Sequence, residues 1–169
     1  GVSCWRGERA VNAHSIGIEI VNPGHEYGYR PFPEVQMQSV TALCQAIIER
    51  YGIAASNVIG HSDIAFQRKE DPGELCDWKG LAKQGIGVSH GDPDVQGGLW
   101  LRMGDTGERV TQMQAALADY GYDITVNGQF DILTEQCVVA FQRHFRPNHL
   151  DGMWDDECAA MLDILLKKR

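Results

Sequence analysis

The sequence has no run of apolar residues near the roughly 20 that a helix needs to cross a bilayer, and no basic-then-apolar signal segment opens it. Basic residues are also scarce, because 15 Lys and Arg are outnumbered by 23 Asp and Glu, for a net charge of -8. Nucleic-acid binding draws on clustered Lys and Arg, so this balance argues against a nucleic-acid partner. The five cysteines lack CxxC spacing, which favours buried thiols over a zinc cluster.

The 169 residues are 43% hydrophobic and 22% charged, as is usual for a folded globular chain with room for two small domains. In the first part, β-branched runs alternate with helical spacing of apolar residues. The order strand, helix, strand indicates an α/β fold, with a mixed sheet flanked by helices. The predicted elements are a strand over residues 15–21, a helix over 34–51, a strand over 56–61 and a short helix over 75–85.

A glycine-rich stretch over residues 85–98 lacks apolar periodicity and is typical of an interdomain linker. We place the boundary near Asp92, so that residues 1–92 form one domain and 93–169 a second. The second domain is predicted to be a small three-helix unit, with helices over residues 110–120, 133–145 and 155–166.

An internal repeat has one copy directly before each of the last two helices. Residues 126–131 read Val-Asn-Gly-Gln-Phe-Asp and residues 150–155 read Leu-Asp-Gly-Met-Trp-Asp. Asn-Gly and Asp-Gly favour tight turns, and the final Asp is suited to cap the next helix. The aromatic residues, Phe130 and Trp154, are interpreted as core side chains rather than sugar platforms.

Four residues of the first domain suggest chemistry. Glu19 lies within an apolar predicted strand, where an unpaired carboxylate is costly. His61 ends the next predicted strand, and Lys69 and Asp71 share the following loop. Each alone is more often structural, but together they indicate a polar site.

Three ordered motifs carry a resemblance to a known family: Ser15-Ile16-Gly17-Ile18-Glu19, Gly60-His61-Ser62-Asp63-Ile64 and Arg68-Lys69-Glu70-Asp71-Pro72-Gly73. They resemble the zinc-dependent N-acetylmuramoyl-L-alanine amidases of the AmpD/AmiD type, which cleave the bond between N-acetylmuramic acid and L-alanine. The resemblance implies Zn²⁺ as cofactor, His61 and Asp71 as metal ligands, Glu19 as the residue that deprotonates water, and Lys69 as the cation beside the oxyanion.

The second domain resembles the peptidoglycan-binding modules attached to such hydrolases, on the motifs Gln112-Met113-Gln114, Asn127-Gly128, Thr134, Ala140-Phe141-Gln142 and Asp151-Gly152. The two resemblances imply a peptidoglycan or muropeptide substrate and a place in the periplasm or cell envelope of a bacterium. A stabilising helical appendage is the alternative interpretation of this domain.

The sequence departs from the family pattern in its zinc ligands. Catalytic zinc sites usually have three protein ligands, and this sequence matches two of the family's positions. The family's first ligand is a histidine on an early strand, so we expect the chain to lack the start of its amidase domain, which a separate N-terminal fragment would complete. His14, His25 and Cys76 are the substitutes considered. If the site stays incomplete, the alternative function is a non-catalytic peptidoglycan-binding fragment; a muropeptide-recognition protein is disfavoured by the four site residues.

Overall fold

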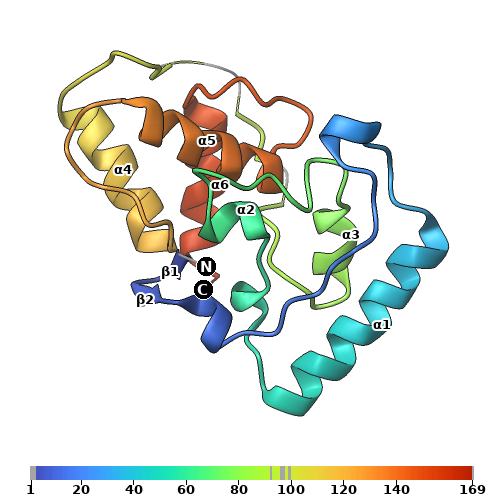
Figure 1. Ribbon diagram of the computed structural model, residues 1–169. Helices are drawn as coiled ribbons and strands as arrows, with labels where there is room; N and C mark the ends of the chain where they lie inside the picture. Colours follow the sequence, from blue (N-terminus) through green and yellow to red (C-terminus); the bar gives the residue numbers. More distant parts are fainter. Residues whose placement is uncertain (1–2, 92, 96–97, 99, 169) are drawn as a thin grey trace.

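The computed structural model describes residues 3–91, 93–95, 98 and 100–168. Its elements are β1 (Cys4–Trp5), β2 (Glu8–Arg9), α1 (Glu34–Tyr51), α2 (His61–Ile64), α3 (Trp78–Lys83), α4 (Glu108–Tyr120), α5 (Ile132–Phe145) and α6 (Asp156–Leu166). Helices α4, α5 and α6 pack together on one side, α1 lies on the other, and α2 lies between them (Figure 1). In these residues no helix has the length and apolar character needed to span a membrane.

The predicted helices are confirmed. Helix α1 begins and ends as its spacing indicates, and Gly52 ends it in a left-handed conformation with φ 64°. The short helix predicted over residues 75–85 is α3, whose N-cap Asp77 accepts a hydrogen bond from the Gly80 backbone. The three helices of the second part are α4, α5 and α6.

The predicted strand over residues 15–21 is wrong for the described structure. The segment has no ladder partner there, and Ile16 and Ile18 are 49% and 36% exposed. A strand requires a hydrogen-bonded neighbour, and in the described residues the one sheet is the antiparallel pair of β1 and β2. The α/β class therefore rests here on a small sheet and six helices.

The strand predicted over residues 56–61 is also wrong. A 3₁₀ turn, Ala55–Asn57, leads into Gly60, and helix α2 begins at His61. The Asp63 side chain accepts a 2.7 Å hydrogen bond from the Gly60 backbone N–H. This capping bond stabilises a helix start, so His61 begins a helix instead of ending a strand.

The main core joins both parts of the chain. Most of its buried side chains come from α4, α5 and α6, but Trp5 and Phe66 belong to the same cluster. Trp5 packs edge-on against Tyr120 and Tyr122, with ring centroids 5.7 and 5.4 Å apart. The predicted boundary residue, Asp92, lies outside the described residues, and the shared core ties the segments on either side of it together.

Two buried glutamines hold the turns of the internal repeat in place. In each copy a glutamine side chain accepts a hydrogen bond from the backbone N–H of a left-handed glycine: Gln114 from Gly128 at 2.9 Å and Gln142 from Gly152 at 3.0 Å. Both glutamine side chains are fully buried. Each turn is therefore fixed by the helix that precedes it, and the predicted core positions of Phe130 and Trp154 are confirmed by exposures of 1% and 6%.

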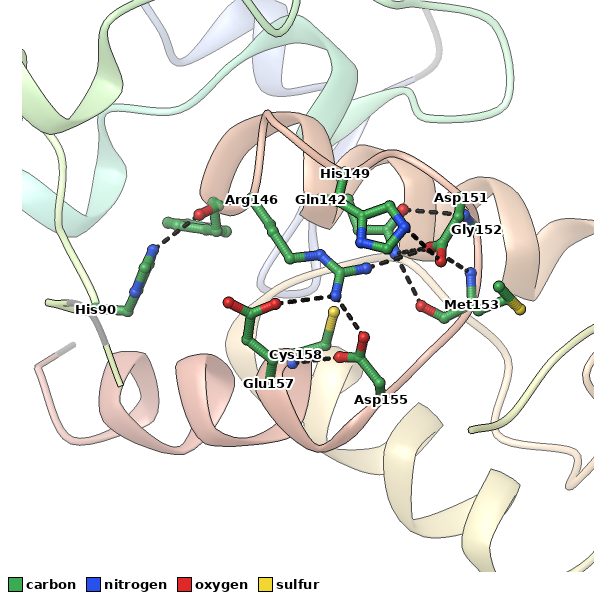
Figure 2. A network of polar contacts seen from close by, with 11 residues as sticks. His90, Gln142, Arg146, His149, Asp151, Gly152, Met153, Asp155, Glu157 and Cys158 are labelled. Atoms are coloured by element: carbon green, nitrogen blue, oxygen red, sulfur yellow. Dashed lines mark hydrogen bonds and ion pairs between the residues drawn. The ribbon is translucent and has the colours of Figure 1, made fainter. Parts of the chain in front are cut away.

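The second copy carries an additional buried cation. Figure 2 shows Arg146 among the carboxylates of Asp151, Asp155 and Glu157, all of which it contacts. Asp155 is also the N-cap of α6. The guanidinium thus fastens the end of α5 to the start of α6.

Candidate active site

His61 and Asp71 meet at the start of α2. The His61 Nδ1 and Asp71 Oδ2 atoms are 2.9 Å apart. The Ser62 backbone N–H also donates a 3.0 Å hydrogen bond to the Asp71 carbonyl oxygen, so the loop is held against the helix. These two predicted ligands, ten residues apart in sequence, are brought together by the fold.

All four predicted site residues line one open cleft of about 1720 Å³. His61 and Asp71 lie beside each other, Lys69 enters from the loop between them, and Glu19 comes from the extended segment that runs past α2. Glu19 is exposed in this structure, so the argument that a buried carboxylate needs a function does not apply to it. Instead, the position of Glu19 in the same cleft as His61 and Asp71 is what supports its predicted role in deprotonating water.

The donor set suits zinc. Two N or O ligands at 2.0–2.1 Å from a tetrahedral zinc lie about 3.3 Å from each other, close to the 2.9 Å between His61 Nδ1 and Asp71 Oδ2. The pair therefore fits two positions of a zinc site. Over the described ranges, no three His, Cys, Asp or Glu side chains gather closely enough to hold a metal ion.

The three substitute ligands also line this cleft, but the two histidines face other carboxylates and the thiol is chemically unsuited. His14 lies 3.9 Å from Glu8, and the His25 ring contacts the carboxylate of Glu74 at 3.0 Å. Cys76 is 4% exposed, and burial raises the pKa of its thiol to about 12. A thiol so protonated is a poor metal ligand until the metal displaces its proton.

Tyr29 fixes the loop that follows Asp71. Its hydroxyl donates to the Pro72 carbonyl at 2.8 Å and accepts from the Leu75 backbone N–H at 3.0 Å. Gly73 lies beneath it, where a Cβ atom would come within 2.2 Å of the Tyr29 hydroxyl oxygen. Burial raises the pKa of the Tyr29 phenol to about 12, so it remains a donor at neutral pH.

The sequence interpretation missed one wall of the cleft. Helix α5 contributes Glu135, Gln136, Val139 and Arg143 to its lining. The Arg143 guanidinium lies 3.7 Å from Glu70 and 3.6 Å from Glu74, on the loop that carries the site. Spacing of three and four residues along α5 is the signal for one helix face, but nothing local indicates which neighbour that face meets.

Two family models match the chain. Residues 3–74 match the model for N-acetylmuramoyl-L-alanine amidase, and residues 106–162 match a peptidoglycan binding domain. The chain is 39% identical to the N-acetylmuramoyl-L-alanine amidase AmiD of Escherichia coli over 99% of its own length and 62% of that protein. The AmiD structure, a complex with anhydro-N-acetylmuramic acid-L-Ala-D-gamma-Glu-L-Lys, superimposes with a TM-score of 0.82 at 38% identity, covering 99% of this chain and 67% of that one.

This chain belongs to the N-acetylmuramoyl-L-alanine amidase family. The amidase-family fold and the attached peptidoglycan-binding domain, expected from the sequence motifs, are confirmed. AmpDh3 of Pseudomonas aeruginosa in complex with an anhydromuramic pentapeptide gives a TM-score of 0.78 at 31% identity, over 99% of this chain and 68% of that chain. AmpD of Enterobacter cloacae is 41% identical over 46% of this chain and 40% of its own length. The chain thus spans about three fifths of AmiD and less of AmpD.

Proposed function

We propose that the chain is part of a zinc-dependent hydrolase that cleaves the amide between N-acetylmuramic acid and L-alanine in peptidoglycan or muropeptides. The observation that carries this proposal is the meeting of His61 and Asp71 in a cleft that Glu19 and Lys69 also line. Family membership supports the reaction, and the muropeptides in the AmiD and AmpDh3 complexes support the substrate class.

His61 and Asp71 would hold the metal, which polarises a carbonyl and acidifies water when bound. The Glu19 carboxylate accepts a proton from the attacking water and passes it to the leaving nitrogen. The Lys69 ammonium stabilises the negative charge that develops on the carbonyl oxygen. Each side chain therefore has one task, at a distinct atom of the scissile amide.

We propose that additional strands occupy part of the cleft. Its volume exceeds the roughly 300–1,000 Å³ of ordinary ligand sites, and its lining includes Ile16 and Ile18 of the extended segment together with apolar residues of α1. Val21, at the end of that segment, is 85% exposed. An extended run with apolar side chains and no ladder partner accepts a neighbouring strand, such as one from an N-terminal fragment that also supplies the third zinc ligand. Native mass spectrometry would detect such a fragment as added mass.

The non-catalytic alternative has one observation in its favour, because the described residues bring together two metal donors and not three. In that case the chain binds peptidoglycan through residues 106–162 without turning it over. Pelleting with insoluble cell wall in the absence of hydrolysis would support this alternative. For either function we propose a location in the periplasm or cell envelope, where peptidoglycan is found.

The experiment that tests the proposal replaces Glu19 in the full-length protein. Glu19→Ala is expected to lower hydrolysis of a muramyl peptide by about 10²–10⁴-fold, the usual contribution of a general base, while bound zinc is unchanged. Glu26→Ala is the matched control, because Glu26 is an exposed carboxylate outside the cleft lining. Retained turnover in Glu19→Ala would exclude the proposed role.

A further inference from the structure

Asp63 is a buried carboxylate two residues after His61, and it faces away from the cleft. It is 1% exposed and is absent from the cleft lining. Its Oδ1 atom accepts a hydrogen bond from the Tyr122 hydroxyl at 2.8 Å, and its Oδ2 atom accepts from His144 Nδ1 at 2.8 Å and from the Gly60 backbone at 2.7 Å. Three donors thus compensate a carboxylate that would otherwise be costly to bury.

Both side-chain donors belong to the peptidoglycan-binding part of the chain. Tyr122 follows α4, and His144 lies in the last turn of α5. The His144 ring is stacked against Trp78 and Phe145, with centroids 4.0 Å away on each. Burial raises the pKa of the Tyr122 phenol well above its usual range, so the hydroxyl remains a donor. Ring stacking therefore holds the His144 donor in place, and burial keeps the Tyr122 donor protonated.

Asp63 also sets the start of the helix that carries His61. Helix α2 has four residues, too few to be stable without tertiary contacts. Its start is set by the Asp63 bond to Gly60, and its Ser62 backbone N–H holds the Asp71 carbonyl. Because α2 carries His61 and is tied to Asp71 by this bond, a shift of α2 would disturb both proposed ligands.

We propose that Asp63, Tyr122 and His144 form an interdomain latch, through which the peptidoglycan-binding part positions the zinc ligands of the amidase part. The three are positioning residues, since none of them lines the cleft with the substrate. The helical part then acts as a structural component of the active site as well as a wall-binding module. The inference that the latch tunes zinc binding rests on the proposed ligand roles of His61 and Asp71.

The test compares four variants of the full-length protein. Tyr122→Phe and His144→Ala each remove one donor, while His144→Asn keeps an N–H close to the Nδ1 position. Asp131→Ala is the control, because it removes the N-cap of α5 at the end of the helix opposite His144. Amide hydrogen exchange is measured across residues 58–71, and zinc affinity by competition with a chromophoric chelator.

Loss of one donor is expected to speed amide exchange at Gly60, Ser62 and Asp63 about five- to tenfold, and to weaken zinc binding by a similar factor. His144→Asn should recover most of both effects relative to His144→Ala. Asp131→Ala lowers stability without touching the latch, so it should leave zinc affinity unchanged. Unchanged exchange in Tyr122→Phe and His144→Ala would overturn the latch, as would an equal loss of zinc affinity in Asp131→Ala. If exchange responds as expected but the wild-type protein binds no zinc, the latch stands and the ligand assignment fails.

Discussion

The buried glutamines of the repeat allow a quantitative prediction. Gln114→Leu keeps the size of the side chain but removes the acceptor of the Asn127 and Gly128 backbone N–H groups, at 3.0 and 2.9 Å. Gln142→Leu removes the partners of the Gly152 N–H and the Met153 carbonyl, at 3.0 and 2.8 Å. Gln114→Leu also removes the donor to the Gln129 carbonyl at 2.9 Å, so three backbone groups lose a partner in that variant and two in Gln142→Leu, at a cost of about 1 kcal/mol or more for each buried group left unpaired.

Each variant is therefore expected to lower the free energy of unfolding by about 2–3 kcal/mol, a large share of the roughly 5–15 kcal/mol of a typical domain. Urea unfolding followed by circular dichroism measures this as a lower midpoint at unchanged slope. Gln112→Leu is the control, because Gln112 lies on the exposed face of α4, and its effect should stay within about 0.5 kcal/mol. If Gln114→Leu costs no more than Gln112→Leu, the turn is not held by the glutamine.

Three further predictions concern the loop after Asp71, a helix cap and a thiol. Gly73→Ala should destabilise by about 2 kcal/mol or more, seen in the same urea assay, because φ is +88° and the new methyl group would displace Tyr29; a neutral effect would contradict this. Asp131→Ala should cost about 1 kcal/mol at pH 7. Because hydrogen bonding from the Thr134 backbone lowers the pKa of Asp131, this cost should shrink as pH falls below about 4, and a cost that persists at pH 2 would count against the cap. Cys76, whose thiol pKa is raised to about 12 by burial, should resist iodoacetamide in the native protein at pH 8 and react after unfolding, as read by mass spectrometry.

The helices were predictable because their determinants are local. The spacing of apolar residues and a terminal glycine define α1, and the caps Asp131 and Asp155 stand at the starts of α5 and α6. The repeat turns were equally local, since Asn-Gly and Asp-Gly carry their own conformational preference. The residues that determine these elements lie within them or directly beside them in the sequence.

The strands and the latch were not predictable, because their determinants lie elsewhere in the chain. Residues 15–21 have strand composition, but a strand exists through its ladder, and no partner is present among the described residues. The start of α2 was not predicted, because Gly60 lacks the Ser or Thr side chain that makes a capping box recognisable in a sequence, and only the Asp63 half of the motif is present. Nothing near Asp63 indicated that its other partners would be Tyr122 and His144, 59 and 81 residues away.

In the proposed site, too, some residues could be predicted from the sequence and others could not. Motif order alone predicted His61, Lys69, Asp71 and Glu19, and the structure places all four in one cleft. The face of α5 that completes the cleft is determined by packing between distant segments, which no single motif encodes. Their roles in binding metal and in catalysis stay predictions.

The most direct test of the account is the zinc content of the full-length protein and its His61→Ala variant, measured by native mass spectrometry. The wild type is expected to carry one zinc ion, and His61→Ala none. His149→Ala is the matched control, since His149 is an exposed histidine paired with Asp151 outside the cleft, and it should retain the metal. A His61→Ala protein that still carries one zinc ion would contradict the assignment of the site.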